Sequence, residues 1–181
     1  MERGATLRLF IALWPGEAVQ DALFAQGARF APLGRRIPAR NIHATLAFLG
    51  AVDPARVDEI VGLIRQARPP DCAFTLDRLG YFKPSRVLWA APASVPQALC
   101  DHQERLAALL GQAGLYGEKR DFRLHVTLLR DVDRPADALL RTDLQVPWET
   151  RDVALAQSEL TRDGARYRVL QRVHAPGAGA P

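Results

Sequence analysis

The chain has 181 residues, of which 48% are hydrophobic and 24% are charged. This is the composition of a globular protein with enough apolar residues to bury one sizeable core, so a mainly disordered chain is excluded. The longest apolar run near the start, residues 9–14, is much shorter than a membrane span and is flanked by Arg8 and Pro15. We therefore expect neither export nor membrane insertion.

The cysteine content points to a reducing compartment. The only two cysteines, Cys72 and Cys100, have no C-x-x-C spacing and no histidine pair nearby, which excludes a disulfide scaffold and a zinc site of the usual spacing. We expect a cytoplasmic protein with no metal, and a monomer by default because the sequence carries no interface signal.

The net charge is +4, and all of the 24 basic residues except Lys83 and Lys119 are arginines. The arginine side chain binds phosphate bidentately, which suits a nucleotide or RNA partner. A GC-rich genome produces the same bias without functional meaning, so the charge alone does not decide.

The first half of the chain predicts strand, helix, strand and helix, in that order. A short apolar strand over residues 7–13 precedes a weakly amphipathic helix over 17–30. A second strand over 42–49 precedes a helix that starts at Asp53-Pro54. In this helix the apolar side chains recur at the spacing that places them on one face: Val57, Ile60, Val61 and Ile64.

The second half predicts strands around one more helix. Residues 74–82 and 87–91 predict a hairpin with a short polar turn, and a helix follows over 96–113. The later strands are predicted over 122–129, 148–160 and 167–173. No linker divides the chain, and this order of elements predicts an α+β fold with two similar halves. We expect one domain over residues 1–174 and a disordered tail over 175–181.

Two segments of the chain share one local pattern. His43-Ala44-Thr45-Leu46 lies in the second predicted strand and His125-Val126-Thr127-Leu128 in a later one. Residues i and i+2 of a strand point to the same face, so each histidine stands beside its threonine while the residues between point into the core. Either segment alone would indicate a histidine bonded inside a sheet, but the pair arises by chance only about once in a hundred such chains.

Two imidazoles on opposite sides of one cleft suit metal-free cleavage of a phosphodiester. One takes a proton from the attacking hydroxyl or water, and the other gives a proton to the leaving oxygen. The unperturbed histidine pKa allows both roles near neutral pH. Thr45, Thr127 and Arg130 are candidates for binding the phosphate oxygens. Because the fifth residue beyond His125 would lie on the opposite face of a regular strand, we expect Arg130 past the strand end; the alternative is a solvated surface arginine.

The sequence resembles the two-histidine (2H) phosphoesterase superfamily, and within it the bacterial RNA 2′,3′-cyclic phosphodiesterase or 2′-5′ RNA ligase branch. The resemblance rests on HATLAFLG at residues 43–50 and RLHVTLLRD at 123–131. The other segments that stand in the order of that branch are LFIAL at 9–13, RVLW at 86–89 and SEL at 158–160, followed by Tyr167. One departure is Leu124, where relatives often have proline.

This resemblance implies a bilobal fold of two pseudo-symmetric lobes of antiparallel sheet, with helices outside, a central cleft, and no metal or other cofactor. The implied substrates are RNA ends or nucleosides with a 2′,3′-cyclic phosphate, opened to 2′-phosphates, and the implied reverse reaction joins tRNA halves by a 2′-5′ bond. By position, His43 matches the proton donor and His125 the proton acceptor. Thr45, Thr127 and Arg130 match residues that bind the phosphate.

Three alternatives remain open at this point. A 2′-5′ oligonucleotide phosphodiesterase would use the same residues. A non-catalytic module could bind RNA ends without turnover, and a metal hydrolase could use the histidines as ligands, although no Asp or Glu sits at ligand spacing beside either motif.

The remaining histidines and aromatic residues predict little chemistry. His102 is expected to be exposed on its helix, and His174 has no partner pattern. The three tryptophans are expected to fill the core rather than stack on bases: Trp14, Trp89 and Trp148. Candidates for stacking on a nucleobase are Tyr81, Phe82 and Phe122.

Overall fold

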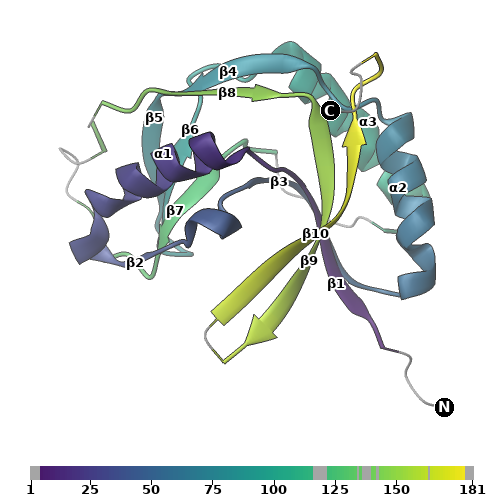
Figure 1. Ribbon diagram of the computed structural model, residues 1–181, viewed down its shortest axis with the longest axis horizontal. Helices are drawn as coiled ribbons and strands as arrows, with labels where there is room; N and C mark the ends of the chain where they lie inside the picture. Colours follow the sequence, from purple (N-terminus) through teal and green to yellow (C-terminus); the bar gives the residue numbers. More distant parts are fainter. Residues whose placement is uncertain are drawn as a thin grey trace.

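A computed structural model describes residues 5–115, 122–133, 135, 140–141, 143–162 and 164–177. Its described strands form two four-stranded sheets and one two-stranded sheet, and every pairing among them is antiparallel (Figure 1). Three α-helices accompany them in the described chain, which confirms the predicted α+β class. The strands are β1 (Leu7–Leu13), β2 (Arg35–Arg36), β3 (Ala44–Val52), β4 (Cys72–Leu76), β5 (Arg78–Phe82), β6 (Val87–Ala91), β7 (Val126–Arg130), β8 (Val146–Thr150), β9 (Asp152–Thr161) and β10 (Gly164–His174). The helices are α1 (Glu17–Ala28), α2 (Val57–Gln66) and α3 (Gln97–Gln112), with 3₁₀ turns η1 (Ala31–Leu33), η2 (Ala39–Asn41) and η3 (Pro54–Arg56).

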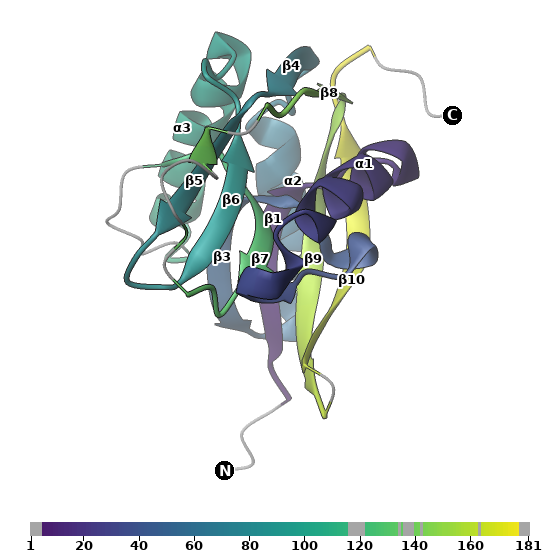
Figure 2. The same ribbon diagram turned by 90° about the vertical axis from the view of Figure 1, so that its left-hand side faces the viewer.

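The two histidine motifs lie in different sheets. The first sheet has the order β10-β9-β1-β3, and the second has the order β2-β7-β6-β5. The first motif therefore lies on an edge strand, β3, whereas the second lies on an inner strand, β7, between β2 and β6. Figure 2 shows both sheets from a second side, with β3 and β7 in the middle of the molecule.

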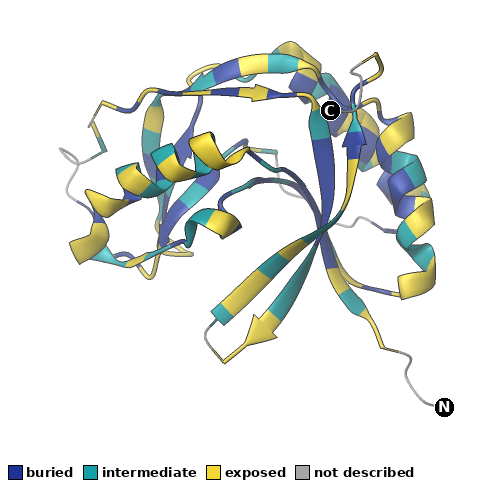
Figure 3. Cartoon of the chain, viewed as in Figure 1, coloured by how far each residue is buried: buried dark blue, intermediate teal, exposed yellow. Residues whose placement is uncertain are grey.

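Each large sheet is covered by helices that bury one apolar face. α1 follows β1 in the chain but packs against β7 of the second sheet and against β8. α2 packs against β10 of the first sheet and against α3, with Ile60, Val61 and Ile64 buried as its spacing predicts. In Figure 3 the exposed residues of the helices lie along their outer side. The chain thus crosses between the sheets, which ties the two halves together.

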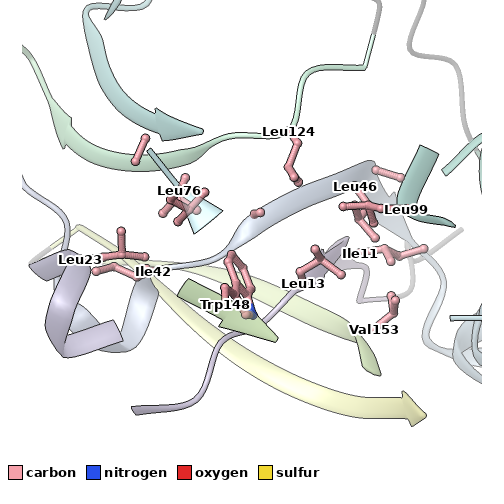
Figure 4. Packing of buried hydrophobic residues seen from close by; sticks show 14 of the residues in the cluster. Ile11, Leu13, Leu23, Ile42, Leu46, Leu76, Leu99, Leu124, Trp148 and Val153 are labelled. Carbon is pink, nitrogen blue, oxygen red and sulfur yellow. The ribbon is translucent and has the colours of Figure 1, made fainter. Parts of the chain in front are cut away.

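One apolar core extends across both sheets and the helices. Ile11 of β1, Leu46 of β3 and Leu99 of α3 gather at one end of it, and Leu23 of α1 packs near Ile42 at the other (Figure 4). Each of these side chains is at most a few per cent exposed. Loss of one such side chain to alanine typically lowers the free energy of unfolding by about 2–5 kcal/mol.

Two predicted strands are each divided between two sheets. The predicted strand over 74–82 breaks at Asp77, whose carboxylate accepts a hydrogen bond from the Ala93 backbone N–H at 2.6 Å. On one side of the break β4 pairs with β8, and on the other side β5 pairs with β6. The predicted strand over 148–160 likewise ends at Thr150 and resumes at Asp152 in the first sheet. Neither break carries a glycine or proline, so no turn residue marks it in the sequence.

Several boundaries also differ from the prediction. The first helix ends at Ala28, and the strand predicted over 122–129 begins only at Val126. The short strand β2 was not predicted. The predicted disordered tail starts too early, because Ala175 is buried and its N–H donates to the Arg151 carbonyl at 2.7 Å. Residues 178–181 of that tail lie outside the described residues.

The expectation that His102 is exposed is wrong. Its side chain is fully buried on α3, and its Nδ1–H points at the carbonyl oxygens of Ala67 and Arg68, each at 3.0 Å. These carbonyls follow the last turn of α2 and have no partner within the helix, so His102 closes that helix end. Burial lowers the pKa of His102, against the two backbone hydrogen bonds that raise it.

Replacing His102 by alanine is expected to lower the free energy of unfolding by about 2–4 kcal/mol, because it opens a cavity and removes a donor from the carbonyls of Ala67 and Arg68, of which only the Ala67 carbonyl keeps a second donor, Nε of Arg105. Activity at temperatures well below the transition should be unchanged. Urea denaturation of H102A beside E104A, an exposed position on the same helix, provides the measurement and its control. An unchanged H102A midpoint would contradict the assigned role.

Candidate active site

The histidines of the two motifs are held in the same way. Each directly precedes its strand, and each Nδ1 lies against the backbone carbonyl two residues earlier, at 2.6 Å for His43 with Asn41 and at 2.7 Å for His125 with Arg123. Because a carbonyl only accepts, Nδ1 carries the proton in both rings. In the neutral form, each ring therefore keeps Nε2 as the atom available to accept a proton.

The threonines stand beside the histidines, as the period of a strand requires. The Nε2 of His43 lies 3.1 Å from Oγ1 of Thr45. Thr127 follows His125 at the same spacing, and both threonines are half-buried. Each sheet thus presents an imidazole nitrogen and a hydroxyl on one surface.

A β-bulge in each motif strand determines which side chain follows the threonine on the same surface. In β7, Trp89 of β6 faces Thr127 and Leu88 faces Leu129, so Leu128 is the extra residue. Leu128 and Leu129 both point into the core, which returns Arg130 to the face of Thr127. The expectation that Arg130 lies past the strand end is therefore wrong: it is the last residue of β7.

The same bulge occurs in β3. There Thr45 pairs with Ala12 and Ala47 pairs with Ile11, so Leu46 is the extra residue and Phe48 takes the position equivalent to Arg130. Phe48 is 60% exposed, although it is a large apolar side chain. The two sheets therefore repeat the pattern His-x-Thr followed by one further side chain, which is aromatic in one sheet and cationic in the other.

Aromatic rings surround His43. Trp14 stacks on its imidazole with a centroid distance of 5.2 Å and an angle of 8°, and Tyr167 meets it edge-on at 5.2 Å. Phe10 lies behind it at 5.0 Å. Trp14 thus forms a wall of the site instead of filling the core, contrary to the prediction. In the sequence, the apolar strand over residues 7–13 ends directly before Trp14-Pro15, and this place at a strand end is the signal that could have set Trp14 apart from a core residue.

Fewer aromatic contacts are described around His125. Phe82 meets the His125 ring edge-on at 5.1 Å, and Trp89 lies 5.3 Å from Phe82. Among the predicted stacking candidates, only Phe82 is seen to touch a motif histidine within the described residues; Tyr81 donates its hydroxyl to the Val132 carbonyl. Trp148 is buried in the core as predicted.

The site favours neutral imidazoles before substrate binds. Burial lowers the pKa of His43 to about 4, with smaller contributions from the positive charges of Arg130 and His125 and an opposing one from the hydrogen bond to Asn41. Burial also lowers the pKa of His125, and Arg130 lowers it further. The two histidines and Arg130 are therefore close enough to interact electrostatically, although they come from separate sheets.

A groove of about 540 Å³ opens next to His43. Asn41, Tyr167 and Arg130 line it, so the groove and the histidine site share residues. No group of three or more His, Cys, Asp or Glu side chains suited to a metal ion is found in the described part of the chain. None of the described helices is long and apolar enough to cross a membrane.

Comparison with known proteins shows that the chain is similar to enzymes of one kind. Residues 15–163 match the family model described as the 2′-5′ RNA ligase superfamily. The RNA 2′,3′-cyclic phosphodiesterase of Escherichia coli K12 is 30% identical over 167 residues, which cover 91% of this chain and 94% of that protein. A protein of the same name from Aquifex aeolicus is 28% identical over 80% of this chain and 84% of its own length.

Solved structures agree with these relatives. The crystal structure of E. coli LigT in its apo form has a TM-score of 0.85 and 27% sequence identity, covering 94% of this chain and 98% of that one. LigT complexed with 3′-AMP has a TM-score of 0.86, with 27% identity over 94% of this chain and 99% of that one.

Proposed function

The chain belongs to the 2′-5′ RNA ligase superfamily, as its sequence predicts, and we propose that it hydrolyses RNA or nucleoside 2′,3′-cyclic phosphates to 2′-phosphates without a metal. The names of its relatives and the 3′-AMP bound by LigT support a nucleotide substrate. The observation that carries the proposal is the repeated geometry: two His-x-Thr groups with the same tautomer, on separate sheets, with Arg130 electrostatically coupled to both histidines.

In the proposed reaction, Nε2 of His125 takes a proton from water while the water oxygen bonds to phosphorus. The bond from phosphorus to O3′ breaks, and Nε2–H of His43 gives its proton to that oxygen. The product keeps the phosphate on O2′ and has a free 3′-hydroxyl. The hydroxyls of Thr45 and Thr127 and the guanidinium of Arg130 stabilise the charge that grows on the non-bridging oxygens.

The proton donor role requires that substrate raise the pKa of His43. The cyclic phosphate is an anion, and an anion close to an imidazole favours its charged form. Binding therefore opposes the burial and the positive charges that keep His43 neutral in the free protein. The bound substrate in this way favours the protonated form of His43, which the proposed reaction requires.

The same groups also account for a joining reaction. If a 5′-hydroxyl of a second RNA takes the place of water, His125 accepts its proton and the bond that forms is a 2′-5′ phosphodiester. Hydrolysis and joining then differ only in the attacking hydroxyl. We propose joining as a secondary reaction, with tRNA halves among its candidate substrates.

The experiment that tests the function uses 2′,3′-cyclic AMP and a short RNA with a 2′,3′-cyclic phosphate end, both in a metal chelator. Phosphorus NMR then identifies the position of the product phosphate, and a 2′-phosphate is expected from both substrates. A 3′-phosphate, or loss of activity in chelator, would contradict the mechanism. RNA binding without turnover would favour the binding module, and cleavage of 2′-5′ linked oligonucleotides alone would favour the other phosphodiesterase.

The pH dependence of kcat/KM is expected to be bell-shaped with its maximum below pH 6.5. This parameter reports the free protein, in which one imidazole must be protonated and the other neutral. Because His43 has a pKa of about 4 and the pKa of His125 lies below its ordinary value, the singly protonated pair is most populated on the acid side of 6.5. Since bound phosphate raises both pKa values, the kcat maximum should lie at higher pH. Initial rates from pH 4 to 9 test this, and a flat profile would exclude the pair.

A further inference from the structure

The groove beside His43 is basic on both sides. One wall is formed by β2 and η2, and the other by the tip of the β9–β10 hairpin, which projects from the first sheet (Figure 1). The described lining contains no carboxylate and four arginines: Arg35, Arg40, Arg130 and Arg166. Its volume of about 540 Å³ falls within the range of ligand-binding pockets, roughly 300–1,000 Å³.

Asn41 fixes the two walls to each other and to the catalytic histidine. Its Nδ2 donates to the Ala165 carbonyl of β10 at 2.9 Å, and its own carbonyl accepts from Nδ1 of His43. The Asn41 side chain is 5% exposed, and its Oδ1 has no partner among the described residues. The groove is therefore a preformed feature whose position relative to His43 is set by one buried residue.

The groove contains more arginines than are needed to bind the one reacting phosphate. Arg130 lies with the threonines, and Arg35 is paired with Asp131 at 3.2 Å. Within the described residues, no ion pair involves Arg40 or Arg166, which stand on opposite walls. A cyclic mononucleotide brings a single phosphate, which the threonines and Arg130 take, so these two guanidiniums would have no anion to bind.

We propose that this groove binds the phosphodiester backbone of RNA directly 5′ to the cyclic phosphate, so that the protein acts on RNA ends in preference to cyclic mononucleotides. The inference rests on the proposed function. An RNA strand supplies further phosphates at regular intervals, and arginines bind them without regard to sequence.

The stereochemistry of the reaction places the upstream strand on this side. In an in-line displacement the attacking and leaving oxygens lie on opposite sides of phosphorus. The leaving O3′ belongs to the terminal ribose, which faces His43, and the upstream strand continues from that same ribose. Because Asn41 and Tyr167 touch His43 and line the groove, the strand leads into it.

The test compares R40A, R166A and the double variant on two substrates, 2′,3′-cyclic AMP and a hexaribonucleotide with a 2′,3′-cyclic phosphate end. For the hexaribonucleotide, kcat/KM should fall about tenfold for each arginine lost, and for 2′,3′-cyclic AMP it should change less than twofold. The slope of log kcat/KM against log salt should become shallower by about 0.7 for each arginine. R65A, an exposed arginine on α2, is the charge-matched control and should leave both substrates unchanged.

The other possible results of this test can be distinguished from one another. Equal losses on both substrates would mean that these arginines act on the reacting phosphate, and no loss on either would mean that the strand 5′ to the cyclic phosphate does not bind in the groove; both overturn the inference. A loss confined to the joining of a 5′-hydroxyl RNA would place the incoming strand in the groove, which also overturns it. Failure of the proposed function would instead appear as a wild-type protein inactive on both substrates.

Discussion

Replacing either His43 or His125 by alanine should lower kcat by about 10²–10⁴-fold, with a much smaller effect on substrate affinity. In the proposed mechanism the acid and the base act in the transition state, when the proton moves, whereas the threonines and Arg130 bind the phosphate in the ground state as well. The double variant should be little worse than the weaker single variant, because the two histidines act as a unit. Single-turnover rates and substrate dissociation constants measure the two effects separately.

The pH profiles of the two single variants should differ in direction and so identify the acid and the base. In H125A the remaining His43 must be protonated, so residual activity should fall as pH rises. In H43A the remaining His125 must be neutral, so residual activity should rise with pH until that imidazole is fully deprotonated. H174A, outside both motifs, serves as a control. Opposite slopes would reverse the assignment, and full activity in either variant would remove that histidine from the mechanism.

The sequence predicts the geometry of each His-x-Thr pair because that geometry is local. A histidine and a threonine two residues apart share a face of any strand, wherever the strand lies. The hairpin of β5 and β6 and the apolar face of α2 are equally local and were predicted correctly. What decides these features is a period of two or 3.6 residues, which is visible in a single sequence.

Features that depend on the partner strand were not predicted. The position of Arg130 on the same face as Thr127 depends on a bulge, and the bulge exists only in the register of β7 against β6. The burial of His102 depends on the end of α2, far away in the chain, and the contact of Trp14 with His43 depends on how β1 and β3 pair. A periodic pattern carries no information about which element lies opposite, so these residues were assigned to the wrong surroundings.

The two bulges also make the two halves of this candidate site asymmetric. Both strands return a third side chain to the surface of the histidine and threonine, and the residue at that position differs: Phe48 in β3 and Arg130 in β7. An aromatic side chain offers an apolar face, and a guanidinium offers charge to the phosphate. The repeated backbone thus supplies two similar scaffolds whose third residues set different environments for the two imidazoles.

Arg130→Ala is expected to lower kcat/KM by about 10²–10³-fold, the effect of losing one preorganised donor to the charge that develops in the transition state. It should also move the kcat/KM optimum to higher pH. The positive charge of Arg130 lowers the pKa of both histidines, in addition to the larger effect of their burial, so its removal raises both pKa values and with them the region of single protonation.

Arg130→Lys separates these two effects. Lysine keeps the positive charge, so the pH optimum should stay near that of the wild type, but it cannot bind the phosphate bidentately, so the rate should still fall. Profiles of kcat/KM for the wild type, R130A and R130K provide the measurement. If R130A and R130K had the same optimum, the charge of Arg130 would have no influence on the histidines. If R130A kept the wild-type rate, Arg130 would lie on the catalytic face without contacting the phosphate.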